Sequence, residues 1–229
     1  MVYAWLAANK EIFKIFFGLV IGLICFAIVA KTHRLFKLSF HQGIRYFRNA
    51  FLFYGIGFLV RYLLGTFFFA NFFGGVYRIA ITAIFEYFLI MAGFFLLYSL
   101  LWKNIEGENP KYSSSLFNWR ISLFYVMALV LVFLDLVWTG ITFMLISQVI
   151  LFALASIISG INTSEGKGKY KFRKYYFIAM ILNFIAWLSN ALVVLFFHYN
   201  QNMIINIYLL NLVVFVLFLY GVIKVTELK

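Results

Sequence analysis

Seven apolar stretches of about twenty residues each run along this chain, with more polar connections between them. A helix needs roughly twenty apolar residues to cross the hydrocarbon core of a bilayer, because it rises only about 1.5 Å per residue. With 66% hydrophobic and 11% charged residues, the chain lies outside the range of soluble globular proteins. We therefore predict an all-α integral membrane protein, a single domain over residues 1–229 that forms a seven-transmembrane helix bundle. The expected spans are 12–31, 49–71, 77–101, 117–138, 141–160, 176–197 and 203–223.

The basic residues predict the orientation of this bundle. If the N-terminus lies outside, fifteen of the nineteen Lys and Arg residues fall on the cytoplasmic side. Cytoplasmic segments of membrane proteins carry such an excess of positive charge. The prediction is therefore N-terminus outside and C-terminus inside, in a prokaryotic plasma membrane. The net charge of +12 is then explained by an anionic inner leaflet, and no nucleic-acid partner is expected.

The order of the segments is consistent with an internal repeat of the 3+1+3 type, with the fourth helix as connector. Shifting the sequence by 125 residues brings Phe47-Arg48 onto Phe172-Arg173. Parallel repeats of this kind occur in known transporters. The sole proline, Pro110, lies in an expected loop, so the spans are expected to be plain helices, in which the glycines at 55, 57 and 93 could still permit bends. The 31 phenylalanines are expected to face lipid for the most part.

Two charged residues are expected close to the middle of the bilayer. Arg61 precedes the turn near Phe73 by about as many residues as Glu86 follows it. In an antiparallel hairpin the two side chains then lie at the same depth. A lone charge at that depth is costly, and a facing opposite charge relieves much of the cost. We therefore predict an Arg61–Glu86 ion pair, which serves either as a structural clamp or as part of a ligand or proton site.

Other polar side chains are expected near the same depth, where they either pack helices together or line an interior pocket that opens outward. Asn183, Trp187 and Asn190 share one face of the sixth span, because their spacing follows the helical period. Asp135 lies nearer the outer end of its span, where it could be solvated. The aromatic segment 67–73 is the expected lid of the pocket. The candidate site is Arg61, Glu86, Asp135, Gln148, Asn183, Trp187, Asn190 and Asn211.

The cytoplasmic side is expected to present a basic face. Segment 31–48 mixes basic and apolar residues, as does an interfacial helix that leads into the second span. These residues either extend toward anionic lipid or dock a protein partner. The basic face comprises Arg34, Lys37, Arg45, Arg48, Lys171, Arg173 and Lys174.

No residue pattern in the sequence indicates catalysis or a metal. His33 and His41 lie in the first cytoplasmic segment and His198 on the other side, so neither haem nor a shared metal is expected. The sequence has no glycine-rich phosphate loop and no serine elbow. The chain is therefore not expected to be an enzyme.

The seven-helix layout, with the N-terminus outside and a buried charge pair, resembles that of the microbial opsins. That resemblance implies a retinal-binding lysine midway along the seventh helix. The corresponding region, Tyr208–Tyr220, contains none, and Lys224 lies at its inner end, so retinal is not expected. The run HQGIRYFRNAFLFY (residues 41–54) resembles the seven-helix membrane modules of prokaryotic sensors. Such modules pass their signal to a soluble domain, and a sensory role is here expected to require a protein partner.

Three functions follow from these observations and remain open at the level of sequence. The first is a receptor-like or regulatory module with a midplane polar site for a small ligand and a basic docking face. The second is a small-solute transporter of the 3+1+3 type that uses the same pocket. The third is an accessory subunit of a membrane complex, in which every buried polar group serves packing.

Overall fold

The computed structural model describes residues 10–39, 41–68, 74–106, 119–138, 140–164, 171–196 and 201–227. The described residues form seven α-helices and one π-helical segment, and they contain no strand. The elements are α2 (Lys10–Ser39), α3 (Gln42–Leu59), η1 (Val60–Phe68), α4 (Gly74–Glu106), α5 (Trp119–Val137), α6 (Thr142–Ser164), α7 (Lys171–Phe196) and α8 (Gln201–Glu227).

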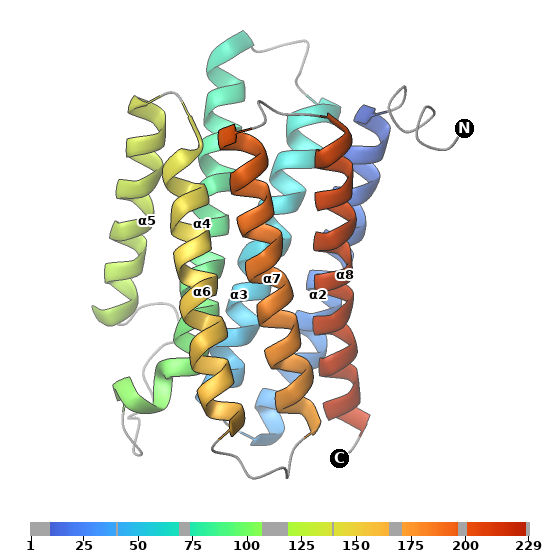
Figure 1. Ribbon diagram of the computed structural model, residues 1–229, viewed down its shortest axis with the longest axis vertical. Coiled ribbons are helices and arrows are strands. Elements are labelled where there is room, and N and C mark those ends of the chain that lie inside the picture. The colour runs from blue at the N-terminus through green and yellow to red at the C-terminus, as the bar shows by residue number, and fades with distance from the viewer. Residues whose placement is uncertain are drawn as a thin grey trace.

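Six of these helices, all except α3, are long and apolar enough to cross a membrane. The predicted all-helical membrane fold is thereby confirmed at this level. The exception is the predicted span 49–71, which the structure divides between α3 and η1. The start of α2 and the end of α8 lie at opposite ends of the bundle (Figure 1).

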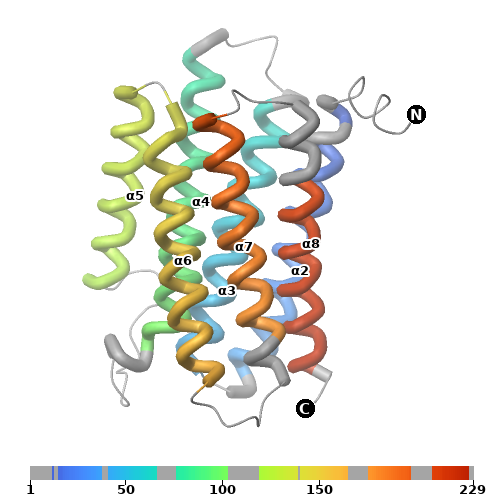
Figure 2. The backbone as a smooth tube through the Cα atoms, in the orientation of Figure 1, coloured from blue at the N-terminus to red at the C-terminus, as the bar shows by residue number. Residues whose placement is uncertain are grey.

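The helices form a ring with one helix outside it. Contacts join α2 to α3 and α3 to α4, and a second consecutive set joins α6 to α7 and α7 to α8. The ring closes where α4 meets α6 and where α8 meets α2. Helix α5 packs on α4 and α6 alone among these elements, at the edge of the bundle (Figure 2).

Burial differs most between α4 and its neighbour α5. In the most apolar part of α4, 61% of the residues are buried, against 22% for α5. Helix α5 turns large apolar side chains outward, among them Leu129 and Phe133, which are 58% and 64% exposed. Such side chains are stable in contact with hydrocarbon, because lipid is as apolar as they are. Helix α5 is therefore a lipid-facing helix, whereas α4 is central.

Aromatic rings fill the core between α3 and α8. The Phe51 ring meets those of Phe215 and Phe218 edge to face, with centroids 6.0 and 5.2 Å apart. The Tyr54 and Phe58 rings meet Phe215 in the same way. Edge-to-face contacts of this kind are favourable beyond the area that they bury. The expectation that phenylalanine mainly faces lipid is wrong for this core, because ten of the described phenylalanines are buried.

The expectation of regular helices is also wrong at η1. The backbone becomes π-helical at Val60–Phe68, directly after α3. Two consecutive side chains then point to different neighbours: Arg61 lies over Phe85 of α4, whereas the Tyr62 ring lies against Gly18 of α2. A side chain larger than hydrogen at position 18 would occupy the place of this ring, so the Gly18 backbone provides the room for it. Segments of π-helix occur frequently at functional sites.

No separate interfacial helix forms over residues 31–48, contrary to expectation. Helix α2 continues to Ser39, and α3 begins at Gln42 after the extended residue His41. Leucine, lysine and arginine in this segment are good helix formers, so the transmembrane helices extend instead of bending into the interface. The basic residues therefore lie on the ends of two antiparallel helices.

Candidate functional site

Two neighbouring helices of the ring, α4 and α6, meet through a buried side-chain amide. The side chain of Gln148 is fully buried, and its Nε2 donates to the carbonyl oxygen of Leu89 (3.1 Å). Gly93 allows this approach, because a Cβ there would lie only 3.1 Å from Gln148 Oε1. That oxygen has no hydrogen-bond partner. Gln148 therefore links two helices and still presents an unused acceptor.

Asp135, a candidate site residue that could have been solvated near the outer end of its span, is 1% exposed and stabilises the start of α6. Its two carboxylate oxygens accept the backbone N–H groups of Phe143 (2.8 Å) and Met144 (2.7 Å). The first N–H groups of a helix have no partner within the helix, and the helix dipole favours a negative charge there. The last turn of α5 thus supplies the cap of α6 across a short connection. The role of Asp135 is therefore structural, as the cap of α6.

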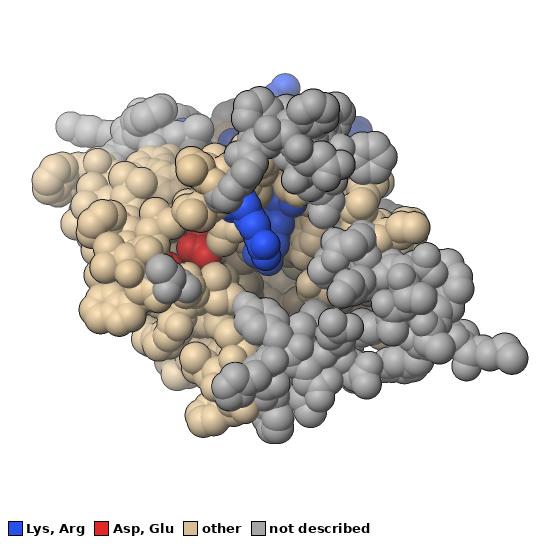
Figure 3. Space-filling view, turned by 90° about the horizontal axis from the view of Figure 1, so that it is seen from above, with Lys and Arg blue, Asp and Glu red and all other residues tan. Residues whose placement is uncertain are grey.

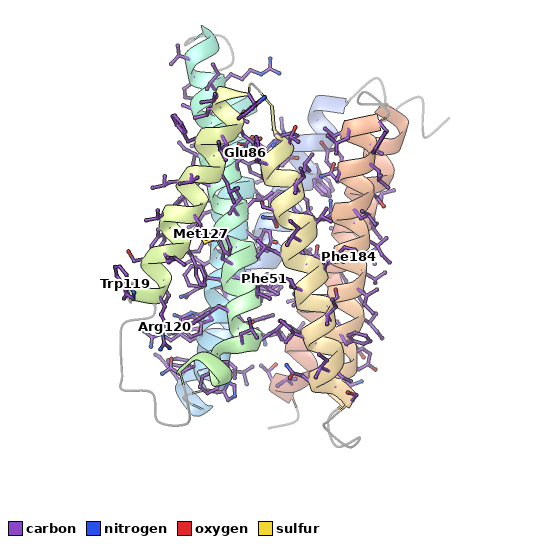
Figure 4. The ribbon with its side chains drawn as sticks, turned by 60° about the vertical axis from the view of Figure 1, so that its left-hand side comes forward. Phe51, Glu86, Trp119, Arg120, Met127 and Phe184 are labelled. Atoms are coloured by element: carbon purple, nitrogen blue, oxygen red, sulfur yellow. The ribbon has the colours of Figure 1, made fainter. Side chains whose placement is uncertain are left out.

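Glu86 is the buried charge that the fold does not satisfy. Its side chain is 2% exposed, and its Oε1 has no hydrogen-bond partner. The charged groups close enough to act on it are Asp135, which repels its negative charge, and Arg61, which attracts it. Figure 4 shows Glu86 on α4, in the half of the bundle nearer the N-terminus. A carboxylate oxygen without a donor in such a place is unusual and is a mark of a functional site.

The predicted ion pair between Arg61 and Glu86 is not formed. The guanidinium carbon of Arg61 lies 4.3 Å from the centre of the Phe85 ring, a cation–π contact with the residue that precedes Glu86. Among the described residues no hydrogen bond or ion pair joins the two charges. Arg61 lies beside the residue that precedes Glu86, but it belongs to the π-helical segment, and the direction of its side chain is not determined by position along the helix.

Charged side chains are visible at the end of the bundle where α2 begins. Figure 3 looks onto this end and shows basic side chains near its centre, with acidic atoms beside them. Only Glu86 and Asp135 have acidic side chains that the structure describes. The acidic atoms seen at this end therefore belong to one or both of these two residues. The side chains of the expected lid, 67–73, lie outside the described residues.

The remaining predicted polar residues do not share one lining. Asn183 is buried near the hydroxyl of Tyr54, without a hydrogen bond of standard geometry. The Trp187 ring is stacked on Phe152 of α6, at a centroid distance of 6.4 Å. Asn190 and Asn211 are half-buried. The structure thus groups Arg61, Glu86 and Asp135, whereas Trp187 belongs to the packing between α6 and α7.

The basic face is present at the opposite end, on α2 and α3. The guanidinium groups of Arg45 and Arg48 lie over the Phe36 ring, 5.9 and 5.8 Å from its centre. Arg48 also donates to Nδ1 of His33 (2.8 Å). Arg34 and Lys37 are exposed. Lys171, Arg173 and Lys174 lie in the first turn of α7, but their side chains lie outside the described ones.

One further cation was missed by the sequence reasoning. The Nζ of Lys224 donates to the hydroxyls of Tyr175 (3.4 Å) and Tyr220 (3.3 Å) and lies near both rings. Tyr220 and Lys224 are four residues apart on α8, a spacing that places them on one face. That spacing could have indicated the contact between Tyr220 and Lys224 from the sequence. The contact with Tyr175 of α7 could be recognised only in the structure.

The described residues contain no group of three or more His, Cys, Asp or Glu side chains that could hold a metal. No family model, curated protein or solved structure matches this chain. The class is therefore defined by the fold: six apolar helices of membrane-spanning length, in a bundle without strands among the described residues, make this a polytopic helical membrane protein.

Proposed function

We propose that this chain is a receptor-like or regulatory membrane module with a polar ligand site in one half and a basic docking face at the other end. The observation that carries the proposal is Glu86, a buried carboxylate with an oxygen that no protein group satisfies. A buried unpaired acceptor is costly to maintain unless something else satisfies it. A ligand that brings a donor to this oxygen would recover that free energy.

The chemistry of the site specifies the ligand class. Glu86 Oε1 is a buried acceptor without a donor, and Arg61, over the ring of the neighbouring Phe85, brings N–H donors and a positive charge nearby. The complementary molecule is small and carries N–H or O–H donors, with a positive charge opposite Glu86 or a negative one opposite Arg61.

The proposed orientation follows the positive charges, with the N-terminus outside a prokaryotic plasma membrane. The ligand site then opens outward, and the basic face on α2 and α3 meets the cytoplasm. Arg34 and Lys37 are exposed there, next to the arginines over Phe36. Exposed positive charge suits an acidic surface of a cytoplasmic or membrane partner protein. Such a partner would receive the signal from this module.

Native mass spectrometry of the protein, released gently from its membrane, tests the proposal. We expect the wild-type protein to retain a small molecule and Glu86→Gln to lose most of it. Glu227→Gln, which removes a carboxylate at the far end of α8, is the matched control and should retain it. A protein partner that copurifies in fixed ratio would support the regulatory function. Equal retention by Glu86→Gln and the control would overturn the proposed site, and a copurified partner without any bound small molecule would favour an accessory subunit.

A small-solute transporter is the second candidate, and the helix contacts favour it. If α2, α3 and α4 are exchanged with α6, α7 and α8, each contact of the six-helix ring falls on another contact of the ring. Helix α5, the proposed connector, lies outside that ring. This is the arrangement expected for a parallel 3+1+3 repeat. Uptake of the retained molecule into proteoliposomes, abolished by Glu86→Gln, would establish transport; binding without uptake would leave the receptor-like function.

A further inference from the structure

Two arginines of α3 converge on one aromatic ring near the end of α2. The guanidinium carbons of Arg45 and Arg48 lie 5.9 and 5.8 Å from the centre of the Phe36 ring. The two arginines are three residues apart, a spacing that places them on one face of α3. Arg45 is close enough to repel the charge of Arg48. The fold therefore holds two positive charges together against their mutual repulsion, away from the polar site near Glu86.

Neutral side chains hold these guanidinium groups in place. Arg48 donates to Nδ1 of His33 (2.8 Å) and to Oδ1 of Asn49 (3.3 Å). Arg45 donates to Oε1 of Gln42 (3.3 Å). A histidine that accepts at Nδ1 is uncharged, so none of these three acceptors supplies a negative charge. The contacts therefore fix the arginines and leave their positive charge unbalanced by these partners.

Arg48 keeps N–H donors for an anion. A guanidinium group has five of them, and within the described part of the chain the acceptors of Arg48 take two. The acidic side chains that the structure describes are Glu86 and Asp135, and both lie toward the other end of the bundle (Figures 1 and 4). Arg48 is half-buried, so a group outside the bundle can reach it. No described carboxylate neutralises Arg48, and its remaining donors suit an anion.

The arginine pair lies where the hydrocarbon layer ends. The part of α2 that is apolar enough to cross a membrane is Ile15–Lys37, so His33 and Phe36 are close to its end. The polar headgroup region, about 5–7 Å thick on each side of a bilayer, begins at that level. Because Arg48 bonds His33, its guanidinium group lies at the depth of the lipid headgroups. This depth favours a lipid over a soluble molecule as the source of the anion.

We propose that Arg45 and Arg48 together bind the phosphate group of an anionic phospholipid. Arginine suits phosphate, because its planar guanidinium group can donate two parallel N–H bonds to two oxygens of one phosphate. The Phe36 ring holds both groups near one point, so the pair is arranged before a lipid binds. Two positive charges favour a lipid with a net negative charge over a zwitterionic one. This site goes beyond the proposed function, in which the exposed Arg34 and Lys37 still face the partner protein.

Native mass spectrometry of the delipidated protein tests this site with two probes, phosphatidylglycerol and phosphatidylcholine of identical acyl chains. We expect the wild-type protein to retain phosphatidylglycerol preferentially. Arg45→Gln and Arg48→Gln should each reduce that preference about five-fold, the factor that corresponds to about 1 kcal/mol for one basic residue at a lipid surface. Phe36→Leu keeps both charges but removes the ring that positions them, so it should also reduce the preference.

The matched control is Arg120→Gln, which removes an exposed arginine at the start of α5, in the same half of the bundle (Figure 4). Its effect measures the general attraction of positive charge for anionic lipid. An equal loss of preference in Arg120→Gln and Arg48→Gln would overturn the proposal, as would an unchanged preference in Phe36→Leu. Helical content by circular dichroism establishes that each variant is folded.

A second readout separates a lipid from a protein on these arginines. If Arg48→Gln releases a copurifying protein and leaves the lipid preference unchanged, the arginines bind the partner protein and the lipid site is overturned. The test does not involve Glu86, so failure of the lipid site and failure of the proposed ligand site are distinguishable.

Discussion

Replacement of Asp135 tests how α5 is attached to the bundle. Asp135→Ala removes both acceptors of the Phe143 and Met144 N–H groups, at 2.8 and 2.7 Å. Loss of a helix cap destabilises by about 0.5–2 kcal/mol, and an orphaned buried N–H adds about 1–3 kcal/mol. Since Phe143 is only half-buried, we expect a total near 2–4 kcal/mol for Asp135→Ala. Asp135→Asn keeps one acceptor and should lose about half as much.

The assay is reversible unfolding in mixed micelles with increasing SDS, followed by circular dichroism. Leu136→Ala is the control, because Leu136 is the next residue of α5 and faces outward. It should remain within about 0.5 kcal/mol of the wild-type protein. If Asp135→Ala is no less stable than Leu136→Ala, the carboxylate does not hold the start of α6 and the reasoning is refuted. An Asn variant less stable than the Ala variant would also contradict it.

Three further predictions use the same unfolding assay. Gly18→Ala should lower stability by about 1–3 kcal/mol, because its Cβ would overlap the Tyr62 ring; Gly22→Ala, which meets only the end of a flexible side chain, should lose less, and the reverse order would contradict this packing. Glu86→Gln should unfold with the same or greater stability than the wild-type protein, because a buried charge without a direct partner is removed; a loss above about 1 kcal/mol would instead indicate a direct ion pair. Gln148→Leu should change stability by less than about 1 kcal/mol, since one hydrogen bond and one unsatisfied oxygen disappear together; a larger loss would show that the oxygen has a partner.

The helical fold was predictable because the bilayer determines the length and composition of its spans. The predicted limits 141–160 and 176–197 differ from α6 and α7 by a few residues, mainly where helices extend beyond the hydrocarbon. Hydropathy does not report such extensions, since the added residues are polar. The continuation of α2 to Ser39 was missed for that reason.

The candidate site was less predictable, because depth along a helix does not determine direction around it. Arg61 and Glu86 were correctly identified as buried or half-buried charges. Their lack of direct contact goes with the π-helical segment, which no proline announces in the sequence, although Gly65 lies within it. Asp135 was named as a candidate site residue, but its role as a cap was missed for a different reason. Its partners are backbone N–H groups of the next helix, which carry no side-chain signal.

The contact between Asp135 and the start of α6 also bears on the order of assembly. While α5 is alone in lipid, its carboxylate has no donors, and an ionised side chain is unfavourable there. The donors belong to the next helix in the chain, only eight and nine residues away. Helices α5 and α6 therefore enter the membrane most favourably together, as a hairpin. Helix α5, which faces lipid, then packs into the bundle only when the second half of the chain has entered the membrane.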